Sequence, residues 1–127
     1  MLTAKDLTTA ERLTLARRRA RETQAQAAQR LGVSLYRYTR WEAGQDAGAP
    51  RAALGRLRVH EVCHVLRRRA GLTVAQVAEL AELSEWWVSQ IEQGEDVQGA
   101  RLVEFWRGCR WSSRSAARKA ARARQGA

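Results

Sequence analysis

The chain contains one segment twice, with the two copies fifty residues apart and aligned without a gap. Residues 17–44 match residues 67–94 at eleven identical positions, from Arg17 and Arg67 at one end to Gly44 and Gly94 at the other. A repeat of this length is one supersecondary unit, which must pack on further elements to bury its apolar face. The chain is therefore constrained to a tandem arrangement of one small fold.

Composition favours helices along the whole chain. The sequence contains nine glycines and one proline, and no stretch alternates polar and apolar residues as a half-buried strand would. We predict an all-α protein with two helical domains, residues 1–58 and 59–108, followed by an Arg/Ala-rich tail, residues 109–127. The tail has no face of large apolar side chains, so we expect it to be disordered alone and to become helical on DNA.

Capping signals predict where the helices begin. Thr8 and Glu11 form a capping box for a first helix that continues to about Arg21. Gly32 follows the second helix where the chain must reverse in a left-handed conformation. The other start signals are Thr23 with Gln26, Thr73 with Gln76, and Ser34.

We expect the segment between the copies to be helical as well. Residues 45–49 form a short loop, and Pro50 suits the first turn of a helix. That helix would continue into a helix at residues 60–70 and give the two domains a rigid connection. A last helix would cover the second core with Leu102, Val103, Phe105 and Trp106.

The charge is strongly positive and unevenly distributed. The net charge is +10, and arginine, whose planar fork suits phosphate and guanine, supplies nearly all the cations. Residues 1–58 carry 12 Lys/Arg against 5 Asp/Glu, residues 59–108 carry 5 against 8, and residues 109–127 carry 6 against none. Double-stranded DNA is the expected partner, and we expect the acidic second domain to bind it less well than the first.

The first copy satisfies the requirements of a helix-turn-helix. Ala28 is small where two helices cross, Gly32 makes the turn, and Tyr38 and Trp41 lie at helical spacing on an inward face. Through TQAQAAQRLGVSLYRYTRWEAG the chain resembles the lambda-repressor/Cro (XRE-type) family over most of residues 9–57, and more loosely over residues 59–107. The resemblance implies a repressor of the phage or mobile-element type.

Site residues follow from the resemblance and from side-chain chemistry. The resemblance implies that Glu42 is structural, that Gln24 holds a phosphate, and that Arg37 lies beside the backbone. The residues implied to face the bases are Leu35, Tyr36, Thr39 and Arg40, of which Arg40 is the best donor to guanine. The arginines that we expect on phosphates are Arg17, Arg18, Arg19, Arg67, Arg68, Arg114 and Arg118.

The second copy departs from this pattern. Val74 stands where the first copy has Gln24, and Glu82 stands in place of Gly32. We expect Glu82 to reshape the turn, because a left-handed glutamate costs about 1 kcal/mol. The exposed face of the last helix of the second copy would read bases through Trp86, Trp87 and Gln90. Alternatively, its two tryptophans would bind a protein partner or a second protomer.

The segment His60–His64 matches the zinc-hydrolase pattern HExxH. Glu61 is also the repeat partner of Glu11, and no third ligand stands out downstream. A small zinc hydrolase is therefore the third hypothesis, after a DNA-binding regulator and a regulator whose second copy is an interaction module. We expect no enzyme activity, no cofactor, no metal and no small-molecule ligand.

The sequence also bears on where the protein acts. No apolar run reaches the roughly 20 residues of a membrane span, and residues 1–13 lack the apolar core of a signal peptide. Cys63 and Cys109 are too few for a disulfide framework. We expect a cytoplasmic, nucleoid-associated protein.

Overall fold

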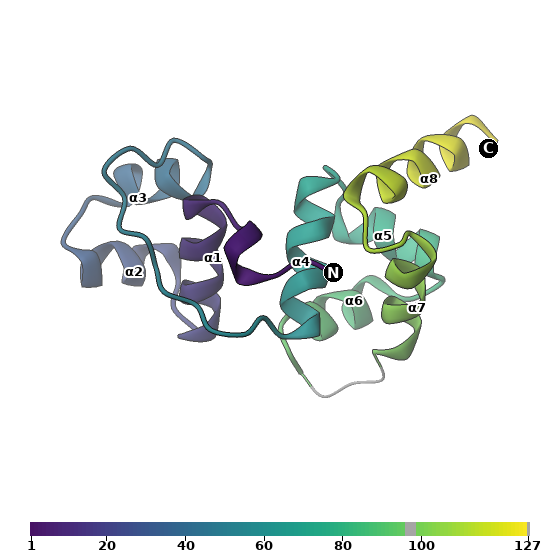
Figure 1. The fold of residues 1–127 in the computed structure, drawn as a ribbon, viewed down its shortest axis with the longest axis horizontal. Coiled ribbons are helices and arrows are strands. Elements are labelled where there is room, and N and C mark those ends of the chain that lie inside the picture. The colour runs from purple at the N-terminus through teal and green to yellow at the C-terminus, as the bar shows by residue number, and fades with distance from the viewer. Residues whose placement is uncertain (96–98, 127) are drawn as a thin grey trace. The chain divides into compact units, whose positions relative to one another are not determined.

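The computed structural model describes residues 1–95 and 99–126, which contain helices and no strand (Figure 1). The all-α prediction is confirmed. The chain forms two compact units, which we name the first unit (Thr3–Leu57) and the second unit (Arg58–Ala127 with Met1–Leu2).

The first unit contains a short 3-10 turn and three helices. These are η1 (Ala4–Asp6), α1 (Thr9–Arg19), α2 (Gln24–Leu31) and α3 (Leu35–Glu42). Its core includes a cluster of Leu13, Ala27, Ala28, Tyr38 and Trp41. The two aromatic rings of this core both come from α3 and meet edge to face at 6.4 Å. Through this buried face α3 packs against α1 and α2.

The predicted helix at Pro50 is wrong, since residues 49–58 have no helical structure. The guanidinium of Arg12 donates to the carbonyl of Ala52 at 3.3 Å, and that of Arg19 donates to the carbonyl of Arg56 at 3.1 Å. Side chains of α1 therefore satisfy carbonyls that a helix would have used in its own backbone bonds. The predicted helical connection between the copies does not exist.

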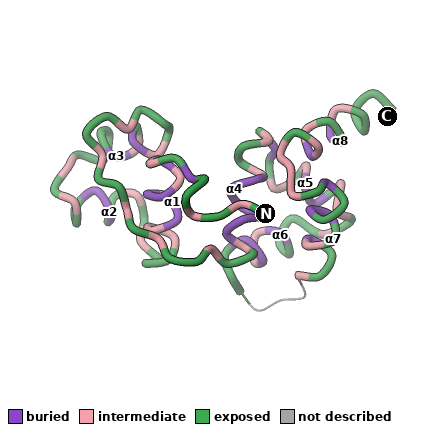
Figure 2. The backbone as a smooth tube through the Cα atoms, in the orientation of Figure 1, coloured by how far each residue is buried: buried purple, intermediate pink, exposed green. Residues whose placement is uncertain are grey.

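The described residues of the second unit, 58–95 and 99–126, form five helices. They are α4 (Val59–Arg69), α5 (Val74–Ala81), α6 (Glu85–Glu92), α7 (Ala100–Gly108) and α8 (Ser113–Gln125). Figure 2 shows α4 buried along much of its length, which agrees with six consecutive buried residues, 61–66. The predicted loop at residues 94–99 lies partly outside the described residues.

The expectation of a disordered tail is wrong. Residues 113–125 form α8, which packs against α4 and α5 and buries Ala116 and Ala120. Two alanines four residues apart present a small flat face, and this lets the backbone of α8 approach its neighbours closely. The cations of the tail thus belong to the second unit, whose sequence from residue 58 onward holds 12 Lys/Arg against 8 Asp/Glu. The second unit is basic rather than acidic.

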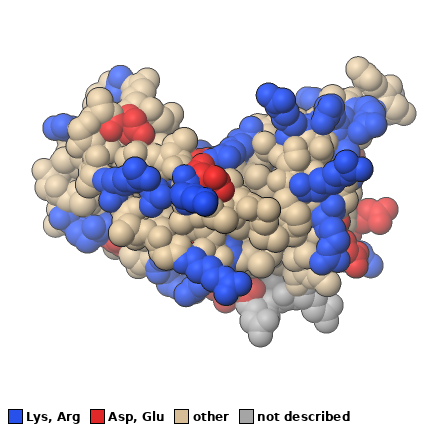
Figure 3. Space-filling view, viewed as in Figure 1, with Lys and Arg blue, Asp and Glu red and all other residues tan. Residues whose placement is uncertain are grey.

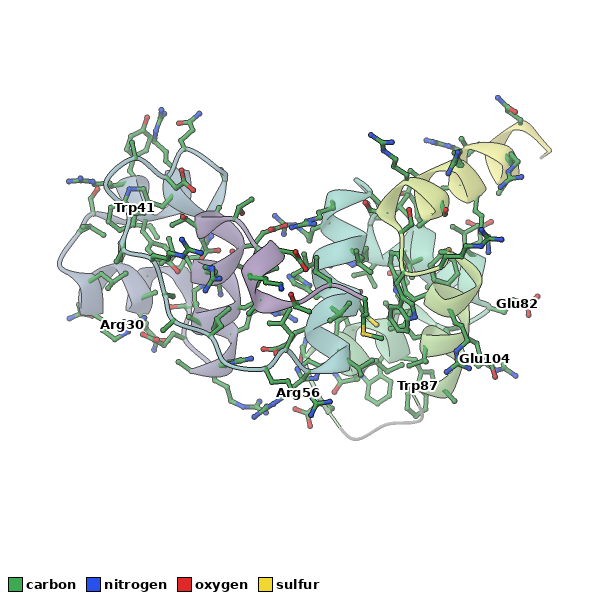
Figure 4. All side chains as sticks on the ribbon, viewed as in Figure 1. Arg30, Trp41, Arg56, Glu82, Trp87 and Glu104 are labelled. Carbon is green, nitrogen blue, oxygen red and sulfur yellow. The ribbon has the colours of Figure 1, made fainter. Side chains whose placement is uncertain are left out.

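The predicted capping boxes are confirmed at Thr8, Thr23 and Thr73. The turn between α5 and α6 is not reshaped, contrary to expectation. Glu82 holds φ 56° and ψ 45°, close to the φ 71° and ψ 29° of Gly32 between α2 and α3. Arg101 donates to the carbonyl of Glu82 at 3.1 Å, while the carboxylate points away from the helices (Figure 4). Surrounding bonds therefore hold this turn in spite of its strain.

Candidate nucleic-acid interface

The exposed face of α3 collects the residues that were predicted to face bases. Ser34 caps this helix by accepting from the N–H of Arg37 at 3.1 Å. The side chains of Leu35 and Tyr36 are 49% and 69% exposed, Arg40 is exposed, and Thr39 is half-buried. One short helix thus presents apolar, hydroxyl and guanidinium groups on the side opposite the core.

The two arginines of α3 rest on aromatic rings of the same helix. Arg40 donates from Nη1 to the hydroxyl of Tyr36 at 2.8 Å, and its guanidinium carbon lies 5.3 Å from the ring centroid. Arg37 lies 5.3 Å from the ring centroid of Trp41. Both guanidinium groups are held by cation–π contacts, so less side-chain entropy is lost when they bind.

An ion pair joins the end of α3 to α1. The Nε of Arg17 donates to Glu42 Oε2 at 2.7 Å, Nη2 donates to Oε1 at 3.1 Å, and Nη1 donates to the carbonyl of Glu22. Gln24 donates to the same carboxylate at 3.2 Å. Burial opposes ionisation of Glu42, but the hydrogen bond from Arg17 and its other donors lower its pKa overall. That Arg17 and Gln24 contact phosphates remains a prediction. In the structure both side chains donate to Glu42 inside the first unit.

The second unit repeats the ion pair with a different third donor. Arg67 Nε lies 2.8 Å and 3.0 Å from the two oxygens of Glu92, and its Nη1 donates to the carbonyl of Leu72. His64 from α4 supplies the contact that Val74 cannot make, with Nδ1 at 3.0 Å from Glu92 Oε1. Burial again acts to raise the pKa of Glu92, and the bonds from His64 and Arg67 lower it overall.

The remaining predicted phosphate ligands lie on three helices. Arg18 is half-buried near the end of α1 and Arg19 is exposed, while Arg68 is exposed near the end of α4. Arg114 and Arg118 are exposed on α8, where lysine and arginine side chains gather in Figure 3. The first unit and α8 therefore both offer cations to solvent.

The tryptophans of α6 are exposed as predicted from the pattern. Trp86 is 59% and Trp87 37% exposed, and their rings meet edge to face at 5.1 Å. Gln90 on the same helix is half-buried. The α6 face thus differs chemically from the α3 face, with indole rings in place of arginines.

The HExxH residues make internal contacts. Glu61 accepts a hydrogen bond from the N–H of Arg58 at 2.8 Å, and His64 contacts the carboxylate of Glu92 through Nδ1. Within residues 1–95 and 99–126 no three His, Cys, Asp or Glu side chains are grouped to hold a metal. Burial, followed by the charge of Glu92, raises the pKa of the Cys63 thiol to about 12. The pattern thus coincides with a helix start and a structural ion pair.

Comparison with known proteins concerns the second unit. Residues 64–123 match a family model described as a helix-turn-helix domain. The second unit contains a helix-turn-helix domain. The match begins within α4 and ends within α8, and it includes α5 and α6, which are joined at Glu82. No curated protein and no solved structure matches the chain.

The helix-turn-helix match falls on the copy that departs more from the lambda-repressor/Cro pattern. It includes most of α8, which the sequence predicts to be a disordered tail. The domain in the second unit is therefore larger than the repeat itself. None of the described helices combines the length and the apolar character that crossing a bilayer requires.

Proposed function

We propose that this chain is a sequence-specific double-stranded-DNA-binding transcriptional regulator that acts as a repressor and reads the major groove with α3. The observation that carries the proposal is the solvent face of α3, where Arg40 is held on Tyr36 beside Leu35. A guanidinium in this setting can donate two bonds to a guanine edge, while apolar side chains contact thymine methyl groups.

The left-handed turns support a second helix-turn-helix in the first unit. Gly32 and Glu82 have closely similar backbone angles, and each is followed by a serine-capped helix. We propose that the chain carries two tandem heads, as regulators of phages or mobile elements would use on an extended site. It would act in the cytoplasm on the nucleoid, by binding and not by catalysis, and without a cofactor.

A selection of random duplexes on the full chain, followed by fluorescence anisotropy, tests the α3 assignment. Arg40→Ala should weaken binding to the selected duplex by about 1–3 kcal/mol and relax the preference at one guanine. Arg51→Ala is the matched control, because Arg51 is an exposed arginine of the same unit outside α3. If Arg40→Ala and Arg51→Ala lose equal affinity, or if Gln90→Ala loses more than Arg40→Ala, then α3 is not the helix that reads the bases.

A protein-interaction role for α6 is the second candidate. The specific observation is the exposed pair of indole rings, since tryptophans of this kind anchor interfaces. Light scattering on the wild type and on Trp86→Ala tests self-association. A dimer that the variant reduces to a monomer supports this role, and a wild-type monomer argues against a second copy as the partner.

A further inference from the structure

A basic hollow lies between the end of α7 and one face of α8. Its cavity volume is about 510 Å³, and its lining includes Gly108, Arg110, Ser115, Arg118, Lys119 and Arg122. Among the described residues, no aspartate or glutamate lines it. Four cationic side chains thus converge on one open space.

The arginines of the hollow have no carboxylate partner. Within the part of the chain that the structure describes, Arg110, Arg118 and Arg122 form no ion pair. By contrast, the exposed Arg30 on α2 pairs with Glu22 at 3.0 Å. Like charges held close together repel one another, so an anion in the hollow would be favoured electrostatically.

The backbone that carries Arg110 is strained. Arg110 and Trp111 have φ values of 54° and 52°, in the left-handed region that glycine occupies without cost. Hydrogen bonds from the N–H of Trp111 to Trp106 at 2.9 Å and from the N–H of Ser112 to Cys109 at 3.0 Å hold this turn. A strained turn that carries a side chain into a cavity is typical of a functional site.

The ammonium group of Lys119 lies close to the backbone of Gly108. A Cβ atom on Gly108 would lie 3.2 Å from Lys119 Nζ, which is tighter than most such contacts. The ammonium also lies 5.9 Å from the ring centroid of Phe105. Lys119 is therefore packed at the hollow rather than spread into solvent.

We propose that this hollow binds a phosphate group. Arginine forks and a serine hydroxyl are donors suited to phosphate oxygens, and lysine adds a point charge. On duplex DNA the ligand is a backbone phosphodiester outside the site that α3 reads, and this form of the proposal rests on the proposed function. A free phosphorylated ligand would be recognised by the same chemistry.

The DNA arm of the test compares two double variants of the full chain on a random-sequence duplex. Arg118→Gln/Arg122→Gln removes two cations from the hollow, and Arg107→Gln/Arg124→Gln removes two exposed cations of the same unit that do not line it. We expect the first variant to lose about tenfold in affinity and about one unit of salt slope, and the second to lose less than about threefold. Equal losses overturn the site, because they indicate charge alone.

The second arm uses tripolyphosphate and needs no DNA. In nuclear magnetic resonance spectra of the full chain, it should shift the side-chain Nε–H signals of Arg118 and Arg122 more than those of Arg107 and Arg124. Arg110→Gly should weaken this binding several-fold without lowering the melting temperature, because glycine relieves the strain at φ 54°. Uniform shifts overturn the proposal. If the chain binds tripolyphosphate saturably but binds no duplex, the phosphate site in the hollow is supported and the proposed DNA-binding function is contradicted.

Discussion

The Nδ1 atom of His64 lies 3.0 Å from Oε1 of Glu92, within the core of the second unit. The first copy has Thr14 at the position of His64, and its carboxylate takes further hydrogen bonds from Tyr38 and Gln24 instead. The two copies thus keep the same Arg–Glu pair and complete it from different helices. The second copy has Val74 and Val88 at the positions of Gln24 and Tyr38, and His64 is the donor that it adds.

Exchange of these donors tests the relationship. His64→Thr should destabilise the second unit by about 1–3 kcal/mol, because Glu92 is left buried with one donor fewer. His64→Thr/Val74→Gln should recover part of the loss, since glutamine supplies the amide donor that Gln24 gives to Glu42. Urea unfolding of the full chain measures both variants, and a double variant no more stable than the single one would contradict the exchange.

Acid should weaken both units through the same carboxylates. The folded pKa values of Glu42 and Glu92 lie below the ordinary value of 4.5. Their stabilisation is therefore complete above about pH 4.5 and is lost as the pH falls towards the lowered folded pKa. Glu92→Gln should flatten the decline in urea midpoint of the second unit between about pH 5 and pH 3, and an unchanged slope would rule out this cause.

The Arg17–Glu42 pair should matter more for stability than an exposed pair in the same unit. Arg17→Leu leaves Glu42 with its side chain 7% exposed and without its main partner, which should cost about 3 kcal/mol. Arg30→Leu breaks the exposed pair with Glu22 and should cost less than about 1 kcal/mol. Thermal unfolding followed by circular dichroism compares the two, and similar losses would mean that Arg17 is not a structural residue.

Tyr36 should act on DNA binding through Arg40. Tyr36→Phe keeps the ring under the guanidinium and removes the hydroxyl that accepts from Nη1. We expect a loss of about 0.5–1.5 kcal/mol, concentrated at the base that Arg40 reads. Anisotropy on duplexes with single substitutions measures it. A uniform loss at every base would show that Tyr36 does not position Arg40.

The left-handed position of Glu82 offers a stabilising change. Glu82→Gly should raise the free energy of unfolding by up to about 1 kcal/mol, because the backbone already has the angles that glycine prefers. Gly32→Ala should lower it by a similar amount, since no atom lies within 4 Å of a Cβ there and only backbone strain acts. Chemical denaturation checks both signs, and destabilisation by Glu82→Gly would show that the side chain has a role of its own.

Local signals allowed most helix starts to be predicted from the sequence. A threonine and a Glu or Gln three residues later form a capping box through neighbouring atoms, so Thr8, Thr23 and Thr73 could be identified without the fold. The inward face of α3, with Tyr38 and Trp41, followed from helical spacing, and its exposed face followed from the resemblance to the lambda-repressor/Cro family.

Tertiary contacts explain what could not be predicted. Residues 49–58 are not helical, and two of their carbonyls, of Ala52 and Arg56, accept hydrogen bonds from Arg12 and Arg19. These donors lie about forty positions earlier in the sequence, so no local pattern indicates the contacts. The face of α8 is made of alanines, which carry little hydrophobic signal although Ala116 is fully buried. The hollow beside Arg110 depends on two left-handed residues that no local pattern marks.

The alternative donors around Glu42 and Glu92 make the two copies poorly interchangeable. A chimera that placed α5–α6 on α1 would combine Thr14 with Val74 and leave the carboxylate with arginine as its one donor from this set. The reciprocal chimera would crowd His64 and Gln24 around a single carboxylate. Each carboxylate is thus matched to the donors of its own unit, and a pair of helices from one unit would not fit the other.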